Sequence, residues 1–582
     1  HFNHVLSPFC STMRATKTAI VLAVALSSKA LSTKPLLDQS FDSQAEELLK
    51  LLNVPGLSVA IVHGNESESK GYGYARIPSA PATADTLYYA GSTTKAFTAT
   101  LAAMMVENKT HFKDVGWSTP LSSLLEGDFA LSKEYESLHT TLEDALSHRS
   151  GLPRHDIACG WGNASTFENI RRMRYLPMTA EPRTRWQYCN TMFGAVGGMI
   201  ERHAGASPES VFRNRIWEPL GMKSTGFTKV DDDRVARGYF WQGEHYVPEK
   251  FTDISGIAGA GATISSVNDY SLWMRALLDA YKGKINPSSP ITSSLWTEIT
   301  RSRSVINVED LEPLTYALGW LIGRLGKHTV VTHDGGVNGY GTTLFLMPDL
   351  DFGFVSMGNT QSTAAIAGAA LFSSLLRKLS PYDQMEINEA KVRGMHEFLS
   401  SRKAFAGLRK SDDADNISLP LPGNVQDYAG LYEHPAYGIL NISLVSPEHA
   451  SRAEIGSQQP LSGTKQIQFS VKPSARLWAI AGTLKHKSHT SFDFDIFSVS
   501  GPIEEGRVDK ECGRVENAGR VLICKNEEAH DMAGTTSAAF ELSIDGNGVT
   551  KLGLQFEPEQ IRRAGEVGGN ANWRESMIWF TK

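Results

Sequence analysis

Residues 91–105, Gly-Ser-Thr-Thr-Lys-Ala-Phe-Thr-Ala-Thr-Leu-Ala-Ala-Met-Met, are the stretch from which both the fold and the chemistry can be worked out. Apolar residues recur from Phe97 at i, i+4, i+7 and i+8, a spacing that predicts a buried helix beginning near Ser92. Ser92 and Lys95 then share one face of the first turn, with Cβ atoms about 5 to 6 Å apart. The lysine amine can accept the serine proton if burial lowers its pKa. The free N–H groups of the helix start favour negative charge beside Ser92.

A Ser-x-x-Lys pair alone is a weak signal, because the chain contains three more. These three pairs are Ser67 with Lys70, Ser400 with Lys403, and Ser462 with Lys465. None of them stands at the start of an apolar helix pattern. The position of Ser92 and Lys95 at a helix start is what singles them out.

Two later segments carry residues suited to the same chemistry. One is Tyr188-Cys189-Asn190, and the other is His333-Asp-Gly-Gly336, in which a short predicted strand runs into a glycine pair that lets the backbone approach a substrate closely. Taken alone, Tyr188 is explained as a buried ring with a satisfied hydroxyl, and His333 as a structural histidine at a strand end. When the three segments are taken together in this order, a catalytic site explains them better than separate structural roles do.

Ser-x-x-Lys, Tyr-x-Asn and His-x-Gly, separated by 188 − 92 = 96 and 333 − 188 = 145 residues, resemble the motifs of the serine β-lactamase and penicillin-binding-protein superfamily. The resemblance covers about residues 36–380. His148-Arg-Ser-Gly-Leu-Pro153 and Gly259-Ala-Gly-Ala262 also look like segments of this family. The Tyr-x-Asn form is closest to class C β-lactamases and the related esterases and D-aminopeptidases.

The resemblance implies a role for each motif residue. Ser92 would be the nucleophile that forms an acyl-enzyme, Lys95 and Tyr188 would share the proton transfers, and Asn190 would orient Lys95 or the substrate amide. His333 would line the opposite wall of the cleft.

The resemblance also implies an oxyanion hole. It would be formed by the N–H groups of Ser92 and Gly336, with Gly335 beside them, and contacts of this kind are worth about 3 to 4 kcal/mol where they have been measured.

The third motif departs from the family pattern, which usually begins with a Lys that helps to hold a substrate carboxylate. His333 is largely neutral at pH 7, and Asp334 would repel an anion if the two side chains faced the same way. We therefore expect a small ester or amide without a nearby carboxylate, with His333 able to assist deacylation. Cys189 is interpreted as a packing residue, because a cysteine nucleophile would need His and Asn partners that the sequence does not place.

Three functions remain open at this level. The first is a hydrolase, because water is the default acceptor for an acyl-serine. The second is an acyltransferase or thioesterase that uses the same serine, lysine and tyrosine. Acyl transfer would differ in the group that attacks the acyl-serine and in how well water is excluded. The third is a receptor that is acylated without turnover. The expected partner is a small-molecule ester, amide or thioester, and a homo-oligomer is possible.

The chain is expected to be α/β over residues 36–380, with an antiparallel sheet flanked by helices and a mostly helical insertion at about 110–290. Residues 381–420 are predicted to be a helical or linker segment. Residues 421–582 have alternating runs typical of an all-β module. Its opening segment, Asp427–Gly438, is similar to the lipocalin-like C-terminal domain of some family peptidases, which implies a barrel. The strands expected there lie at 440–444, 466–471, 492–497 and 552–556.

Composition excludes several classes of protein. The 582 residues carry 57 basic and 63 acidic side chains, a net charge of −6, so nothing favours nucleic-acid binding. No apolar run reaches the roughly 18 residues of a membrane span, and no metal or cofactor motif lies near the three segments.

The two ends of the chain carry further expectations. Residues 1–35 contain a possible signal peptide from Met13, which slightly favours secretion over a cytoplasmic location. Cys512 and Cys524 either close a β-hairpin or stay unpaired.

Overall fold

The structure is a computed structural model that describes residues 35–159, 164–227, 232–242, 244–249, 251–306, 314–379, 420–444, 468–472, 479–500, 524–525, 534–542, 549–555 and 577–582. The expectations for residues 1–34, for the 381–420 segment up to residue 419, and for Cys512 lie outside the described residues. The predicted pairing of Cys512 with Cys524 therefore stays open.

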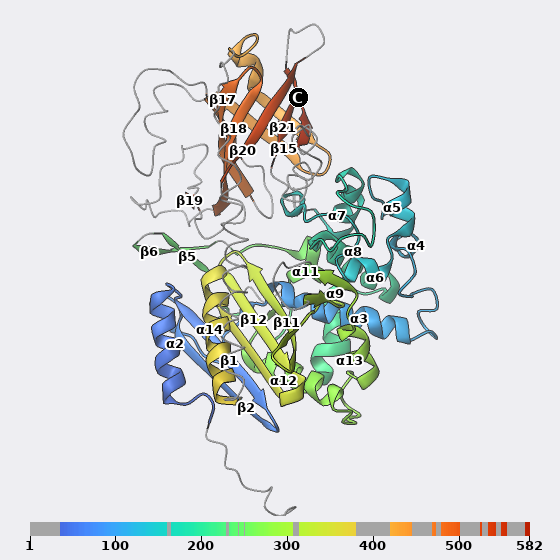
Figure 1. The fold of residues 1–582 in the computed structure, drawn as a ribbon, viewed down its shortest axis with the longest axis vertical. Helices are drawn as coiled ribbons and strands as arrows, with labels where there is room; N and C mark the ends of the chain where they lie inside the picture. The colour runs from blue at the N-terminus through green and yellow to red at the C-terminus, as the bar shows by residue number, and fades with distance from the viewer. Residues whose placement is uncertain are drawn as a thin grey trace, which may run out of the picture.

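A nine-stranded sheet of antiparallel neighbours is the centre of the first part of the chain (Figure 1). Its order is β3-β2-β1-β13-β12-β11-β10-β9-β8. The strands are β1 Gly56–His63, β2 Glu66–Arg76, β3 Ala80–Pro81, β8 Ser304–Ile306, β9 Leu314–Tyr316, β10 Leu321–Leu325, β11 His328–Val337, β12 Tyr340–Met347 and β13 Phe352–Gly358. Because β1 pairs with β13, the two ends of this α/β part meet inside one sheet.

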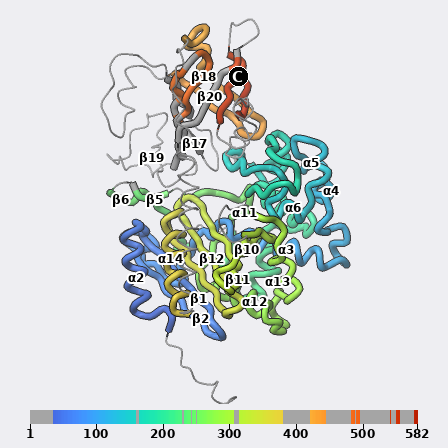
Figure 2. The backbone as a smooth tube through the Cα atoms, viewed as in Figure 1, coloured from blue at the N-terminus to red at the C-terminus, as the bar shows by residue number. Residues whose placement is uncertain are grey.

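Each face of the sheet is covered by its own helices and has its own core. In β1, Val59 and Ile61 belong to the core under α2 (Gln39–Leu51) and α14 (Ser362–Leu379), and Ala60 and Val62 belong to the core on the other side. This alternation is the two-residue period of a strand with both faces buried. Figure 2 shows α2 and α14 side by side on the first face. The second face packs on α12 (Val267–Tyr281).

The segment between β4 (Tyr88–Tyr89) and β8 contains more helices than strands, and the predicted helical insertion at about 110–290 lies within it. Its longer helices are α3 (Thr94–Glu107), α8 (Asn190–Ala204), α12 and α13 (Ser293–Thr300). Shorter ones are α4 (Leu121–Leu124), α5 (Glu134–His139), α6 (Leu142–Leu146), α7 (Thr166–Arg172), α9 (Pro208–Phe212), α10 (Glu218–Leu220) and α11 (Ala258–Gly261). The described part of this segment also holds the short strands β5 (Tyr239–Gln242), β6 (His245–Pro248) and β7 (Ile264–Ser265).

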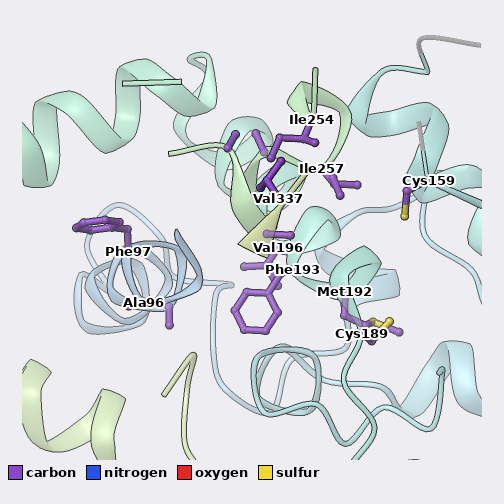
Figure 3. Packing of buried hydrophobic residues seen from close by; sticks show 14 of the residues in the cluster. Ala96, Phe97, Cys159, Cys189, Met192, Phe193, Val196, Ile254, Ile257 and Val337 are labelled. Atoms are coloured by element: carbon purple, nitrogen blue, oxygen red, sulfur yellow. The ribbon is translucent and has the colours of Figure 1, made fainter. Parts of the chain in front are cut away.

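Helix α3 is buried on all sides, more completely than its one predicted apolar face requires. Small residues and threonines make this possible: the Thr98 hydroxyl donates to the Gly259 carbonyl at 2.6 Å and the Thr100 hydroxyl to the Ala96 carbonyl at 2.8 Å, so these buried polar atoms are paired. Figure 3 shows Phe193 and Val196 of α8 near Ala96 of α3. The helix that carries Lys95 is therefore held rigidly in the core.

The sequence of residues 316–322 predicts one short strand, but the structure divides it: β9 ends at Tyr316 and β10 begins at Leu321. Gly319 turns the chain between them with a φ of 73°, and a Cβ there would lie 2.6 Å from the Lys95 carbonyl oxygen. The break lets the loop pass against the start of α3.

The described C-terminal residues form a second sheet, in the order β17-β16-β15-β14-β22-β21-β20-β18-β19. Its strands are β14 Gly430–His434, β15 Gly438–Leu444, β16 Gln468–Lys472, β17 Ala479–Ser488, β18 Ser491–Ser500, β19 Cys524–Lys525, β20 Gly534–Leu542, β21 Val549–Leu554 and β22 Ile578–Thr581. All four predicted runs overlap one of these strands. The lipocalin-like barrel stays a prediction at this point.

None of the described helices combines the length and apolar character that a membrane crossing would require.

Candidate active site

Ser92 lies where a glycine-rich strand passes directly against the start of α3. It belongs to the single turn η1 (Gly91–Thr93), and Gly91 has a φ of 54°, a left-handed conformation that favours glycine. A Cβ on Gly91 would lie 2.6 Å from the backbone nitrogen of Gly336, and a Cβ on Gly335 would lie 1.9 Å from the Ala90 carbonyl oxygen. Glycine at these positions therefore lets β11 lie directly beside Ser92, with the Gly336 nitrogen near the turn.

Lys95 is fully buried, and its amine is surrounded by oxygen atoms. Nζ lies 3.0 Å from Ser92 Oγ, 2.7 Å from Asn190 Oδ1 and 2.9 Å from the Ala260 carbonyl oxygen. The Ala260 carbonyl reaches this position because α8 and α11 pack closely: a Cβ on Gly259 would lie 2.6 Å from the Phe193 carbonyl.

Tyr188 contacts Ser92 from the opposite side, and its hydroxyl donates to Ser92 Oγ at 2.8 Å. It sits just before α8, and Asn190 is the first residue of that helix. The Tyr188 ring packs against His148 in a tilted arrangement with centroids 4.2 Å apart, and the His148 Nδ1 accepts from the Cys189 N–H at 3.0 Å. The structure thus brings the side chains of Ser92, Lys95, Tyr188 and Asn190 into one hydrogen-bonded group.

Cys189 points into the core, where Figure 3 shows it beside Met192. Its sulfur lies 3.1 Å from the Thr191 hydroxyl, in keeping with the packing role expected from the sequence.

His333 is buried and is hydrogen-bonded within its own side of the cleft. Its Nδ1 lies 2.7 Å from the Asp334 carbonyl oxygen, which can only accept, so Nδ1 carries the proton and Nε2 accepts from the Tyr316 hydroxyl at 2.9 Å. The Asp334 side chain is exposed and alternates with His333 along β11, so the two point to opposite faces of the strand. The condition under which Asp334 would repel an anion beside His333 is therefore not met.

Burial controls the charge state of these groups. It lowers the pKa of Lys95 well below its ordinary value, with Arg154 adding to the effect and Asp156 opposing it. Burial raises the pKa of the Tyr188 phenol, and lowers the pKa of His333 to about 3. Burial therefore favours the uncharged form of the Lys95 amine and the protonated form of the Tyr188 phenol, and it keeps the His333 imidazole neutral at pH 7.

A short loop places two opposite charges next to this group. The Arg154 guanidinium carbon lies 4.8 Å from the centre of the Tyr188 ring, and Arg154 Nε donates to Asp156 at 2.7 Å. The other Asp156 oxygen accepts from Asn190 Nδ2 at 2.9 Å. This contact fixes the Asn190 amide with its oxygen toward Lys95.

Several residues of the site were not singled out from the sequence: Arg154, Asp156, Ala260, His148 and Tyr316. His148 and Ala260 stand in the two segments that resemble the family, and Arg154 and Asp156 follow the first of them. That resemblance was the available signal, but the contact of Ala260 is made by a backbone carbonyl, which no residue type reveals.

The buried histidines predict an acid-sensitive fold. Burial lowers the pKa of His148 well below 6.5, that of His155 to about 4 and that of His333 to about 3. As the pH falls below 6.5 the unfolded chain binds protons that the folded chain does not, so stability is lost. The slope is about 1.4 kcal/mol per pH unit for each histidine.

Urea denaturation followed by tryptophan fluorescence at pH 7, 6 and 5 measures this loss. The urea midpoint should fall at each step. It should fall more gently in His155→Asn, because that variant has one buried histidine fewer. Asparagine is chosen because it tolerates the left-handed conformation of His155. A midpoint that stays constant from pH 7 to 5 would contradict the buried neutral histidines.

Among the described residues, no group of three or more His, Cys, Asp or Glu side chains is arranged to hold a metal ion.

Comparison with known proteins gives the same family as the motifs. The Beta-lactamase family model matches residues 41–373. Unguisins hydrolase ungD' of Aspergillus campestris is 36% identical over 425 residues, which cover 70% of this chain and 78% of that relative. Unguisins hydrolase ungD of Aspergillus violaceofuscus is 33% identical over 452 residues, 72% of this chain and 79% of that relative.

A solved structure supports the fold. The octameric penicillin-binding protein homologue from Pyrococcus abyssi aligns with a TM-score of 0.53 at 20% identity, covering 89% of this chain and 98% of that one.

Proposed function

Because the chain belongs to the beta-lactamase family and is a serine hydrolase of that family, we propose that it hydrolyses a small ester or amide through an acyl intermediate on Ser92. The observation that carries this proposal concerns the half-buried Ser92 hydroxyl. It lies 3.0 Å from the buried amine of Lys95 and 2.8 Å from the phenol oxygen of Tyr188. A serine is activated when a base lies within hydrogen-bonding reach of it and a third group holds that base in place.

The contacts of Lys95 support its role as the base for acylation. A neutral amine has two N–H groups, and the oxygens of Asn190 and Ala260, which can only accept, take both. The lone pair is then directed at the Ser92 hydroxyl. Ser92 can give its proton to Lys95 while it accepts from Tyr188, so Oγ becomes more nucleophilic as it attacks the substrate carbonyl.

Tyr188 is suited to carry a proton to the leaving group. Its phenol keeps its proton at neutral pH because burial raises its pKa, and its hydroxyl already points at Ser92 Oγ. In our proposal it donates to the leaving oxygen or nitrogen and is reprotonated from Lys95. Water then attacks the acyl-serine, with Lys95 as the base again.

The proposed oxyanion hole uses the N–H groups of Ser92 and Gly336, with Gly335 allowing the approach. Its support is the contact of β11 with η1, which requires glycine on both sides. The developing negative charge would also lie at the start of α3, where free N–H groups favour it.

The substrate class follows from the charge of the cleft wall. His333 is neutral and its Nε2 is engaged by Tyr316, so it offers no cation to a substrate carboxylate. Arg154, over the Tyr188 ring, is paired with Asp156. A neutral ester or amide therefore fits better than a penicillin. The two fungal relatives are named as hydrolases of unguisins, which makes an unguisin a candidate substrate.

A panel of p-nitrophenyl esters, D-amino-acid amides, an unguisin and a chromogenic cephalosporin tests the proposal. We expect an ester burst of one equivalent followed by steady turnover. The kcat/KM for the cephalosporin should be about 10- to 150-fold lower, since a lost charge-assisted contact is worth about 1.5 to 3 kcal/mol. A burst without turnover would indicate a receptor. Turnover only with an added alcohol or amine would indicate a transferase. Rapid cephalosporin hydrolysis would contradict the interpretation that His333 offers no positive charge to a substrate carboxylate.

The finer structural assignments belong to the proposal as well. The place of the chain in the class C, esterase and D-aminopeptidase branch is supported by the Tyr188-Cys-Asn190 motif. A lipocalin-like barrel over residues 421–582 is supported by β17, which pairs with β18 as well as with β16. Secretion and a homo-oligomeric state stay predictions.

A further inference from the structure

A tyrosine of the C-terminal module is buried against the catalytic part of the chain. Tyr437 stands in the turn between β14 and β15, and its hydroxyl lies 2.5 Å from Nδ1 of His155. The two rings meet edge to face with centroids 6.0 Å apart, and both residues are only 1% exposed. This contact between residues 282 positions apart is therefore shielded from solvent.

The direction of this hydrogen bond can be assigned. His155 Nε2 lies 2.9 Å from the Pro177 carbonyl oxygen, which can only accept, so Nε2 carries the ring proton. Nδ1 is then an acceptor, and the Tyr437 hydroxyl donates to it. Burial lowers the pKa of His155 to about 4, which keeps the ring in this neutral form at pH 7.

His155 has a backbone conformation that needs such support. Its φ of 46° is left-handed, which is uncommon and strained for a residue other than glycine. The turn that it makes separates two residues that both reach the site: Arg154 lies over the Tyr188 ring and Asp156 binds Asn190. Holding His155 therefore holds both neighbours.

Tyr437 is itself fixed within its module. The His434 Nδ1 accepts from the N–H groups of Ala436 and Tyr437 at 3.1 and 3.2 Å, which closes the turn. Phe580 of β22 packs against the Tyr437 ring with centroids 6.1 Å apart. The hydroxyl is thus presented to His155 by a rigid turn.

We propose that Tyr437 is a positioning residue, whose hydroxyl holds His155 and thereby keeps the Arg154–Asp156 loop in place against Tyr188 and Asn190. A chain of contacts joins the two modules: Tyr437 to His155, Asp156 to Asn190, and Asn190 to Lys95. The C-terminal module is then required for the rate of the reaction. This inference rests on the proposed function of Ser92, Lys95 and Tyr188.

The charges around Lys95 give the expected effect on pH dependence. The Lys95 amine lies directly beside Ser92, Asn190, the Ala260 carbonyl and the Tyr188 ring. The charges of Arg154, Asp156 and Cys189 act on its pKa. The charge of Lys95 in turn acts on the pKa values of His148 and His333. After burial, Arg154 has the largest effect and lowers the pKa of Lys95, and Asp156 has a smaller opposite effect. A displaced loop should therefore raise this pKa.

The test compares Tyr437→Phe with Tyr432→Phe in the full chain. Both changes remove one hydroxyl from a buried ring of the same module, but the Tyr432 hydroxyl donates within that module, to the Tyr428 carbonyl at 2.9 Å. With a p-nitrophenyl ester, Tyr437→Phe should lower kcat about tenfold, as expected for one lost hydrogen bond, with KM within twofold. The acid limb of kcat/KM should move to higher pH. Tyr432→Phe should leave both unchanged.

His155→Asn tests the same contact from the catalytic side, and it decides the question if Tyr437→Phe does not fold. It should show the same slower kcat and shifted limb, and the double variant should be no slower than the slower single one. Equal kcat and equal limbs in Tyr437→Phe and Tyr432→Phe would overturn the proposal, and so would losses that multiply in the double variant. Activity that persists in Ser92→Ala would instead overturn the proposed function.

Discussion

Replacement of Ser92 by alanine should lower kcat for p-nitrophenyl esters by about 10⁴-fold or more, the range seen when an enzyme loses its nucleophile. The variant should still fold, because Ser92 is only half-buried and, among the described residues, its hydroxyl is hydrogen-bonded to the site residues Lys95 and Tyr188. Steady-state assays with a thermal melt of the same sample measure both quantities.

Ser67→Ala is the matched control. Ser67 also precedes a lysine by three residues, but it is exposed on β2, and its Lys70 binds Asp42 rather than a serine. This variant should retain full activity. Turnover that survives in Ser92→Ala at more than a few per cent would exclude Ser92 as the nucleophile.

Replacement of Lys95 by methionine should be the next largest loss, about 10³- to 10⁴-fold in kcat/KM, because the side chain keeps its approximate size but has no basic nitrogen to accept the Ser92 proton. Asn190 Oδ1 and the Ala260 carbonyl lose their donor, which costs about 1 to 3 kcal/mol each if they stay unsatisfied. The protein is therefore expected to melt at a lower temperature but to remain folded.

Lys95→Arg separates the role of a base from that of a charge. Arginine carries a positive charge but cannot lose its proton, so it should be as slow as methionine. The pH profile gives an independent check: the wild-type kcat/KM should rise with pH through an acid limb that both variants lack. Recovery of activity in Lys95→Arg would show that the site needs a cation there.

The sequence allowed the local parts of the site to be predicted. Ser92 and Lys95 are three residues apart on one helix, so their contact follows from helix geometry alone. Tyr188 and His333 lie far along the chain, and only the order of the motifs connected them with Ser92. Long-range contacts of this kind depend on the pairing of β1 with β13 and β11 with β12, which a single sequence does not specify.

The remaining contacts could not be predicted for identifiable reasons. Ala260 contributes a carbonyl, and Asp156 is placed by the left-handed conformation of His155, which nothing in the residue type requires. The break at Gly319 illustrates the same limit. A glycine inside a strand pattern can signal a close backbone approach, but the group approached, the Lys95 carbonyl, belongs to a distant helix.

The most direct measurement is mass spectrometry of the protein after reaction with a p-nitrophenyl alkylphosphonate, which stops at the covalent stage. The account predicts one equivalent of phosphonyl adduct, carried by the peptide that contains Ser92, absent from Ser92→Ala and formed slowly in Lys95→Met. A stoichiometric adduct on any other residue, or an unlabelled protein that still hydrolyses esters, would contradict it.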